Sequence, residues 1–211
     1  MFKISYKLIL GLGFVFVLNA CVQPEVRPSG DDNKNTWGEE GNINDVDISD
    51  LDGNLTESEM IITEEGGRQV MERVPFSTSE YNSLARYGKG TIKGSIYVNG
   101  IYGDKVLGVN TRLYLNPVTS YSQQWYEESY LGGYKMEKAD KRLFNYLKFT
   151  ASNSEGDFAF YGVPSGSYYL IGTVKCSTQC GYETEKNIRI ATRVSISGNQ
   201  IIEQDLIRVE N

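Results

Sequence analysis

The chain of 211 residues contains no histidine. Histidine is the usual general base near neutral pH, so its absence excludes Ser–His–Asp and Cys–His catalytic arrangements. It also removes the imidazole ligands on which many zinc sites depend. No phosphate-binding loop of the form G-x-x-x-x-G-K-S/T is present. We therefore expect a protein that is not an enzyme and that uses neither a metal nor another cofactor.

Two carboxylate pairs are the remaining candidates for catalysis. Glu127 and Glu128 are neighbours, so their side chains would diverge on a strand. Glu183 and Glu185 could share one face, but both lie in a polar, loop-like stretch. We interpret all four as solvated surface charge.

Long hydrophobic runs are also scarce. A largely apolar run extends only from Leu8 to Leu18, whereas a membrane-spanning helix needs about 20 residues. Lys3 and Lys7 precede this run and small residues follow it. This order of a basic region, a short apolar region and small residues is typical of a secretory signal peptide.

The end of this signal, Leu18-Asn19-Ala20-Cys21, resembles the lipobox of bacterial lipoproteins. The resemblance implies a signal peptide at residues 1–20 and a Cys21 that carries lipid, including palmitate, as the mature N-terminus. The residue after the cysteine is Val22 and not aspartate, which in sorted lipoproteins of Gram-negative bacteria favours the outer membrane. The resemblance then implies a lipid anchor in the cell outer membrane, with the protein facing the periplasm or the cell surface. The alternative is an ordinary signal peptide with an incidental cysteine.

An acidic segment follows the signal. Residues 22–85 contain 15 acidic and four basic residues, whereas residues 86–211 contain 12 acidic and 15 basic ones. Apolar residues are sparse in its first half, so it cannot bury enough surface to repay the entropy of ordering. We expect residues 21–59 to form a disordered, self-repelling tether between lipid and domain. The alternative is that this segment lies on the basic face of its own domain.

One part of the tether has the spacing of a calcium loop. Residues 48–59 place Asp50, Asp52 and Glu59 at ligand positions of an EF-hand. Ile48 occupies the first position, where an aspartate is needed, and no amphipathic helix precedes it. We therefore favour a plain acidic linker over a calcium site.

Residues 60–89 are expected to form an extended arm and a short helix. Ser77 and Glu80 have the spacing of a capping box, and apolar residues follow at helical intervals. This pattern predicts a helix over about residues 78–87, at the start of the folded domain.

Residues 90–211 carry the alternation of antiparallel strands. One strand is expected over residues 90–98 and a second over residues 109–115. The stretch from Thr150 to Val174 indicates three strands separated by two tight turns. About seven strands at this spacing suit a two-sheet sandwich. The predicted fold is all-β, a seven-stranded antiparallel β-sandwich.

The stretch from Thr150 to Val174 resembles the signature of the carboxypeptidase regulatory-like family. That signature reads D/N-x-x-G-x-F-x-F-x-x-V-P-x-G-x-Y-x-L, and the matching residues are Asn153, Gly156, Phe158, Phe160, Val163, Pro164, Gly166, Tyr168 and Leu170. The resemblance covers roughly residues 90–209. It implies a transthyretin-like sandwich with a non-catalytic accessory or adhesive role, because the family is named for a module that accompanies a peptidase domain.

Residues 117–134 depart from strand alternation. They contain five aromatic residues that could contact a partner: Tyr121, Trp125, Tyr126, Tyr130 and Tyr134. One interpretation is that Tyr121 and Trp125 cover an open end of the sandwich with their polar tips hydrogen-bonded. The other is an aromatic contact surface for a protein or a glycan. Both can hold if some rings are buried and others are presented.

Cys176 and Cys180 are separated by three residues in a domain that we expect to be exported. This spacing differs from the C-x-x-C redox motif and favours a disulfide that closes a small loop. Such a loop gains at most roughly 2 kcal/mol from chain entropy. We predict a structural bridge at the tip of a hairpin.

Three functions fit these observations. The favoured one is a lipid-anchored cell-envelope protein whose sandwich binds or supports another envelope protein without catalysis. The second is a glycan- or peptidoglycan-binding module that uses residues 117–134. The least favoured is a carboxylate-based hydrolase. Nucleic acid is not an expected partner, because the domain is only mildly basic.

Overall fold

The computed structural model describes residues 70–210. The predicted signal peptide, Cys21, the tether and its calcium-like loop lie outside the described residues, as does the first part of the arm. The strands are β1 (Val70–Met71), β2 (Gly90–Asn99), β3 (Lys105–Leu107), β4 (Arg112–Pro117), β5 (Lys135–Met136), β6 (Lys148–Ala151), β7 (Asp157–Val163), β8 (Gly166–Cys176), β9 (Lys186–Ile196), β10 (Ile201–Glu203) and β11 (Leu206–Val209). The helical segments are α2 (Thr78–Asn82), α3 (Ser120–Gln124), the π-helix η3 (Trp125–Leu131) and the 3₁₀ turns η4 (Lys141–Tyr146) and η5 (Thr178–Cys180).

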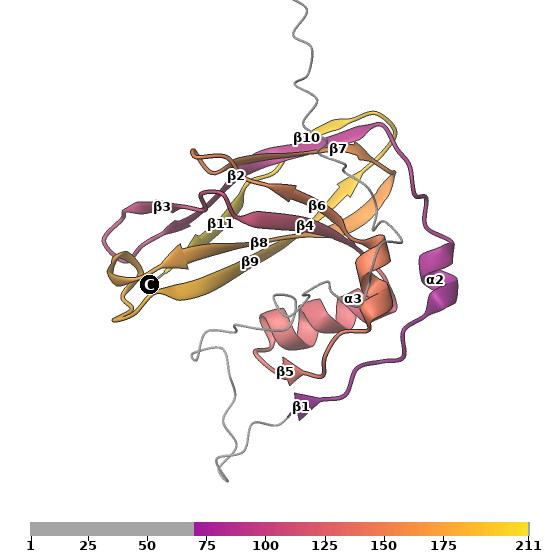
Figure 1. Cartoon of the computed structure of the whole chain (residues 1–211), viewed down its shortest axis with the longest axis horizontal. Coiled ribbons are helices and arrows are strands. Elements are labelled where there is room, and N and C mark those ends of the chain that lie inside the picture. Colours follow the sequence, from indigo (N-terminus) through magenta and orange to yellow (C-terminus); the bar gives the residue numbers. More distant parts are fainter. Residues whose placement is uncertain (1–69, 211) are drawn as a thin grey trace, which may run out of the picture. The chain divides into compact units, whose positions relative to one another are not determined.

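Two sheets pack face to face in a sandwich (Figure 1). In the first sheet, β2 is central, with β3 and β7 antiparallel on it and β10 and β11 parallel to it. In the second sheet the order is β6-β4-β8-β9, and every pairing is antiparallel. The mostly β fold with two packed sheets confirms the predicted all-β sandwich.

The strand pattern differs from the prediction in the number and the direction of the strands, since the two packed sheets contain five and four strands instead of seven in total. We expected antiparallel pairing throughout, but β10 and β11 run parallel to β2. The chain crosses from the second sheet to the first after β9, and a crossing of this kind, unlike a hairpin, can deliver a strand parallel to its neighbour. A further short strand, β3, pairs with the end of β2.

The alternating residues of the strands build the core between the sheets. Ile92, Ile96 and Val98 of β2 are fully buried, as the sequence pattern predicts. Phe158 and Phe160 of β7 face the same core, with their rings in edge contact at 6.1 Å. Side chains from both sheets therefore interdigitate in one apolar layer.

The second predicted strand is shorter and more deeply buried than the alternation indicates. It begins at Arg112 because Asn110 has a φ of 49°, which interrupts the extended backbone. Tyr114 alternates with the core residues Leu113 and Leu115 and so points to the other face of the sheet, yet it is only 4% exposed. A second layer of side chains covers the outer face of this sheet, so β4 is buried on both sides.

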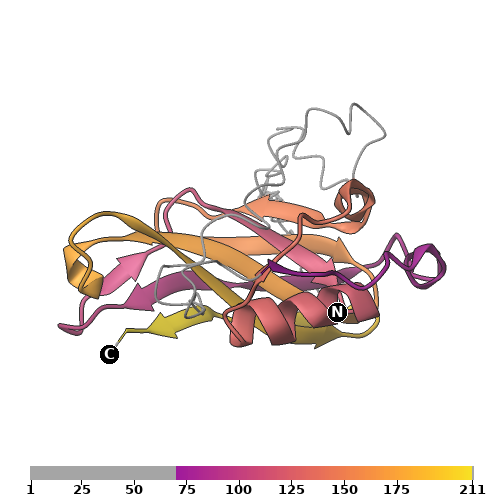
Figure 2. The same cartoon turned by 90° about the horizontal axis from the view of Figure 1, so that it is seen from below.

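The second layer comes from the segment between β4 and β6. Its helical part, α3 and η3, runs alongside the strands of the second sheet (Figure 2). Side chains from this segment pack with Tyr114, Tyr169, Ile171 and Ala191 of the sheet. We call this helical segment, residues 120–131, the crossover helix. Together with the two sheets, the crossover helix gives the domain three layers.

The short helix before β2 also belongs to this layer. α2 covers residues 78–82 and stops earlier than predicted. The Ser77 hydroxyl caps it by accepting a hydrogen bond from the Glu80 N–H. The Glu80 carboxylate does not complete a capping box in α2; it accepts a 2.8 Å hydrogen bond from the Ser120 N–H at the start of α3. One acidic side chain thus joins two helices that are distant in sequence.

Candidate functional site

Two of the five predicted contact residues are buried. Tyr121 and Trp125 are 3% and 6% exposed, and both pack on the outer face of the second sheet. The Tyr121 hydroxyl accepts a 2.7 Å hydrogen bond from the Asp140 N–H, as expected for a buried tyrosine tip. These two rings are therefore withdrawn from solvent, and they cover the outer face of the second sheet instead of an open end of the sandwich.

Tyr126 and Tyr130 are half-buried in a stack of rings. Tyr126 lies on Tyr169 with centroids 4.4 Å apart, and Tyr130 lies 5.4 Å from Tyr126 and 6.0 Å from Trp125. Tyr134 follows the helix and is also half-buried, with its N–H donating to the Glu128 carbonyl. The ring faces of the stack are largely used within the molecule, which leaves mainly ring edges for a partner.

A concave surface lies elsewhere on the same sheet face. It has a volume of about 430 Å³, within the range of small-molecule sites. Its walls come from the loop before β4 and from the outward positions of β4, β8 and β9. The lining residues are Leu107, Gly108, Val109, Asn110, Thr111, Arg112, Thr173, Lys175, Asn187 and Arg189. We call this surface the groove.

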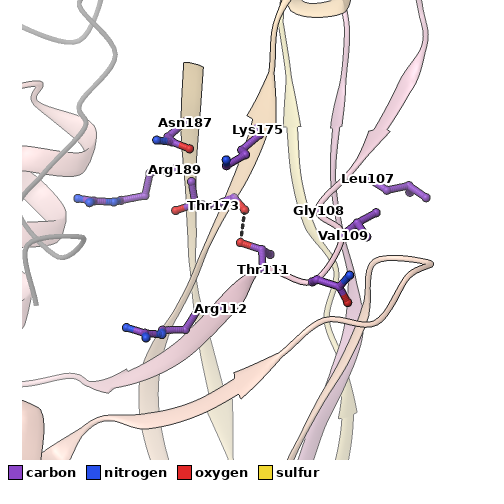
Figure 3. Close-up of a pocket in the computed structure, with 10 residues that line it drawn as sticks. Leu107, Gly108, Val109, Thr111, Arg112, Thr173, Lys175, Asn187 and Arg189 are labelled. Carbon is purple, nitrogen blue, oxygen red and sulfur yellow. Dashed lines mark hydrogen bonds between the residues drawn. The ribbon is translucent and has the colours of Figure 1, made fainter. Parts of the chain in front are cut away.

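The strand register places the polar residues of the groove in two rows. Thr173 pairs with Arg189, and Lys175 pairs with Asn187. Leu113 of β4 pairs with Gly172 of β8, so Arg112, one residue earlier, lies beside Thr173 on the outward face. Figure 3 shows Arg112 and Arg189 extending from the strands to the same side. Two arginines from different strands thus flank one threonine.

The loop wall of the groove is fixed by hydrogen bonds. The Thr111 hydroxyl donates to the Thr173 carbonyl at 2.7 Å, the contact drawn in Figure 3. The Thr111 N–H donates to the Ser152 hydroxyl at 2.9 Å. Leu107 and Val109 form an apolar rim of the groove, and Val109 is 46% exposed. The groove therefore combines a rigid polar floor with a small apolar rim.

The charges that line the groove are all positive. Arg112, Lys175 and Arg189 are cations, and none of the ten lining residues is acidic. Lys175 pairs with Glu185 at 3.3 Å, but both side chains are well exposed, so this pair is weak and exchangeable. Arg112 lies over the Phe149 ring at 5.8 Å, and Arg189 is 5% exposed. The lining of the groove is therefore cationic, with Arg189 buried and Lys175 paired with an exposed carboxylate.

Three of the four carboxylates considered for catalysis, Glu127, Glu128 and Glu185, engage neighbouring side chains. Glu127 and Glu128 accept hydrogen bonds from Gln123 and Gln124, one helical turn earlier. Glu185 is the exposed partner of Lys175. Within residues 70–210, no group of three or more Asp, Glu, Cys or His side chains could hold a metal ion.

The predicted disulfide is confirmed. Cys176 and Cys180 are joined with an S–S distance of 2.01 Å and a Cα–Cα distance of 5.9 Å. The bridge closes the turn between β8 and β9, which contains η5. The Gln179 carbonyl in this turn accepts a hydrogen bond from the Ile101 N–H at 3.0 Å. The bridged tip therefore supports the neighbouring loop between β2 and β3.

Sequence reasoning missed the groove. Its residues come from three strands and a loop, and their proximity depends on the pairing of β4, β8 and β9. The available signal was that the outward positions of β8 and β9 change from apolar (Ile171, Ala191) to polar (Thr173, Arg189) along the strands. This change marks the end of the surface that the crossover helix covers.

None of the helices in the described part of the chain has the length and apolar character that a membrane span requires. No protein-family model matches the sequence, and no curated protein matches it either.

Among solved structures, the fold is similar to that of a proposed carbohydrate-binding protein from Pseudomonas aeruginosa. The two chains are 25% identical, with a TM-score of 0.57, and the match covers 64% of this chain and 99% of the other. A second match, (S)-allantoin synthase, has 8% identity and a TM-score of 0.30 over 59% of this chain and 42% of that one. This second likeness is too weak to support an argument. The chain is therefore an all-β sandwich similar along most of its folded part to a protein linked with carbohydrate binding.

Proposed function

We propose that this protein binds carbohydrate, without catalysing a reaction, and that the groove is its binding site. The observation that carries the proposal is the similarity, over 99% of that chain, to the Pseudomonas protein. The groove supports it, since its volume of about 430 Å³ can seat a short saccharide. Thr173 and Asn187 offer the hydroxyl and amide groups with which proteins orient sugar hydroxyls.

The expected setting of this binding is the bacterial envelope. The lipobox-like Cys21 would anchor the protein to the outer membrane, and the acidic segment at residues 21–59 would hold the domain away from the lipid. The signature within residues 153–170 would make the sandwich a carboxypeptidase regulatory-like, transthyretin-like module. Labelled fatty acid incorporated into the wild type but not into Cys21→Ser would support the anchor, whereas equal labelling would refute it.

A glycan array that includes peptidoglycan fragments tests the proposed function. We expect the full chain to retain specific saccharides, and Thr173→Val with Asn187→Ala to weaken that retention. Lys93→Gln is the matched control, because Lys93 is a surface residue paired with Glu203 on the first sheet. Melting curves of all variants separate lost binding from lost folding. An array on which no saccharide is retained would refute carbohydrate binding.

A protein partner in the envelope is the second candidate function. Four large apolar side chains are exposed on β7, β10 and β11 of the first sheet: Tyr161, Ile201, Ile207 and Val209. The register places Tyr161 and Ile201 on either side of Thr91 on one face. Exposed apolar side chains gathered on one sheet are a feature of protein contact surfaces. Crosslinking in intact cells followed by mass spectrometry would identify such a partner, and recovery of only polysaccharide would exclude it.

A further inference from the structure

We infer that the groove recognises an uncharged saccharide and that Asn110, in the loop before β4, is one of its contact residues. This inference rests on the proposed function, and it names the class of ligand and a further residue for the same site. It follows from two features of the lining: the charged side chains are engaged within the chain, and Asn110 has an unusual backbone conformation.

The cations of the groove already have partners or are buried. Arg112 lies over the Phe149 ring at 5.8 Å, and Arg189 is only 5% exposed. Lys175 pairs with Glu185 at 3.3 Å. An acidic sugar at Lys175 would exchange one carboxylate for another, which gains little free energy at an exposed site. The formal net charge of −6 on the whole chain also disfavours the approach of an acidic ligand. The lining therefore gives an acidic saccharide no advantage over an uncharged one.

The uncharged polar side chains of the groove are open to a ligand. Within residues 70–210, no hydrogen bond is made by the Thr173 hydroxyl or by the side-chain amides of Asn110 and Asn187. Asn110 is exposed, and the other two are half-buried. Thr173 and Asn187 are diagonal neighbours on β8 and β9, which places them roughly 7–8 Å apart. Amides and hydroxyls both donate and accept hydrogen bonds, as the hydroxyls of a sugar do.

Asn110 has a backbone conformation that side chains rarely adopt. Its φ is 49°, and it is the one residue other than glycine with a positive φ in the described part of the chain. The loop around it is fixed by Ser152, whose hydroxyl accepts from the Thr111 N–H at 2.9 Å and donates to the Gly108 carbonyl. The Asn110 N–H donates to the Asn153 carbonyl at 3.3 Å. Strained residues that the surrounding structure holds in place are concentrated at ligand sites, so we assign Asn110 to ligand contact.

The apolar rim next to Asn110 suits the other face of a sugar. Val109 is 46% exposed and lines the groove together with Leu107. A pyranose ring carries hydroxyl groups at its edge and apolar C–H groups on its face, so one ring can contact both the rim and the amides. An ionised group would lose hydration against this rim. The combination again favours an uncharged saccharide.

A glycan array with matched charges tests the class of ligand. Methyl-esterified polygalacturonate is paired with polygalacturonate, and dextran is paired with dextran sulfate, so the members of each pair share a backbone and differ in charge. Chitotetraose and cellotetraose add short uncharged saccharides. We expect the full chain to retain the uncharged members more strongly than their acidic counterparts. Retention should be the same at low and high salt, because salt screens interactions between charges.

The Asn110→Gly variant tests the contact residue, by calorimetric titration with the uncharged saccharide of this set that is retained most strongly. Glycine adopts a positive φ without steric cost, so the variant should melt at or above the wild-type temperature while its affinity falls about fivefold, the effect of one uncharged hydrogen bond. Asn110→Asp tolerates the same backbone but lacks the amide donors, and it should also weaken binding. Asn199→Gly is the matched control, because Asn199 is exposed in the turn that follows the far end of β9.

The outcomes separate this inference from the proposed function. Stronger retention of the acidic members, or retention that high salt abolishes, would overturn the uncharged class while carbohydrate binding stands. Wild-type affinity in Asn110→Gly, or an equal loss of affinity in Asn199→Gly, would overturn the role of Asn110. An array on which no saccharide of either charge is retained would refute the proposed function itself.

Discussion

Tyr126 lies almost flat on Tyr169, with ring centroids 4.4 Å apart and ring planes inclined by 18°. This stack joins the crossover helix to β8 on the outer face of the second sheet. Trp125, one residue earlier, packs into the same layer and is 6% exposed. The aromatic residues of this segment therefore hold the crossover on the sheet, and the open groove lies beyond the part of the face that they cover.

Replacement of Trp125 by alanine should destabilise the domain without altering the groove directly. Removal of a buried tryptophan leaves a cavity and costs about 3–5 kcal/mol. Chemical denaturation followed by circular dichroism measures the loss. Leu131→Ala, in the same helix but 65% exposed, is the control and should change stability by no more than about 0.5 kcal/mol. Equal effects of the two variants would contradict the covering role.

Gly94→Ala should disrupt the join between β2 and the last two strands. A Cβ on Gly94 would lie 2.2 Å from the Gln204 carbonyl oxygen, which is backbone and cannot rotate away. The Gln204 N–H donates to the Lys93 carbonyl at 2.8 Å, so this segment is held in place. We expect a loss of about 1–3 kcal/mol, measured by thermal denaturation.

Gly166→Ala is the matched control for Gly94→Ala. The atoms nearest to its Cβ would be the Tyr168 hydroxyl and ring, at ordinary contact distances of 3.4 Å or more. The midpoint of unfolding should stay close to that of the wild type. A Gly94→Ala protein as stable as Gly166→Ala would mean that the last strands are not packed on β2 in this way.

Loss of the disulfide should have a small and local effect. A loop of this length contributes at most roughly 2 kcal/mol through chain entropy. The Cys176→Ser, Cys180→Ser variant should therefore fold, but the Ile101 amide, which donates to Gln179 in the bridged turn, should exchange its hydrogen faster. Hydrogen exchange by mass spectrometry checks this. A fully unfolded variant, or unchanged exchange at Ile101, would contradict the local role.

Asp140 should contribute a stability that depends on pH. The Arg142 side chain donates to both Asp140 carboxylate oxygens and the Arg142 N–H donates to one of them, which holds the pKa of Asp140 below its ordinary value. A lowered folded pKa stabilises the fold above the ordinary value, near 4, and that stabilisation is lost as the pH falls through the folded value. We expect Asp140→Asn to lower the unfolding temperature at pH 7 and to match the wild type near pH 2.

The Asp140→Ala variant separates the effect of the carboxylate charge from the effect of the helix cap. Asp140 begins η4 by accepting from the Arg142 N–H, a role that asparagine can keep and alanine cannot. The alanine variant should be less stable than the asparagine variant at both pH values, by about 1 kcal/mol. An Asp140→Asn protein with the same deficit at pH 2 as at pH 7 would show that the charge pair with Arg142 does not stabilise the fold.

The local sequence pattern was sufficient to predict the sandwich core and the disulfide. The burial of Ile92, Ile96 and Phe160 follows from a strand period of two, which is a property of neighbouring residues. The disulfide could be predicted because Cys176 and Cys180 are so close in sequence that a turn alone brings them together.

Long-range packing decided the rest. Tyr114 is buried and Tyr121 is withdrawn from solvent only because the crossover helix folds back over the second sheet. The groove exists because β4, β8 and β9 pair in one register, which brings Arg112 beside Thr173 and Arg189. Sequence alone determined which residues point to each face of a strand, since that is set by the backbone period. Which faces are covered and which stay open depends on contacts between distant segments, and only the tertiary structure fixes these.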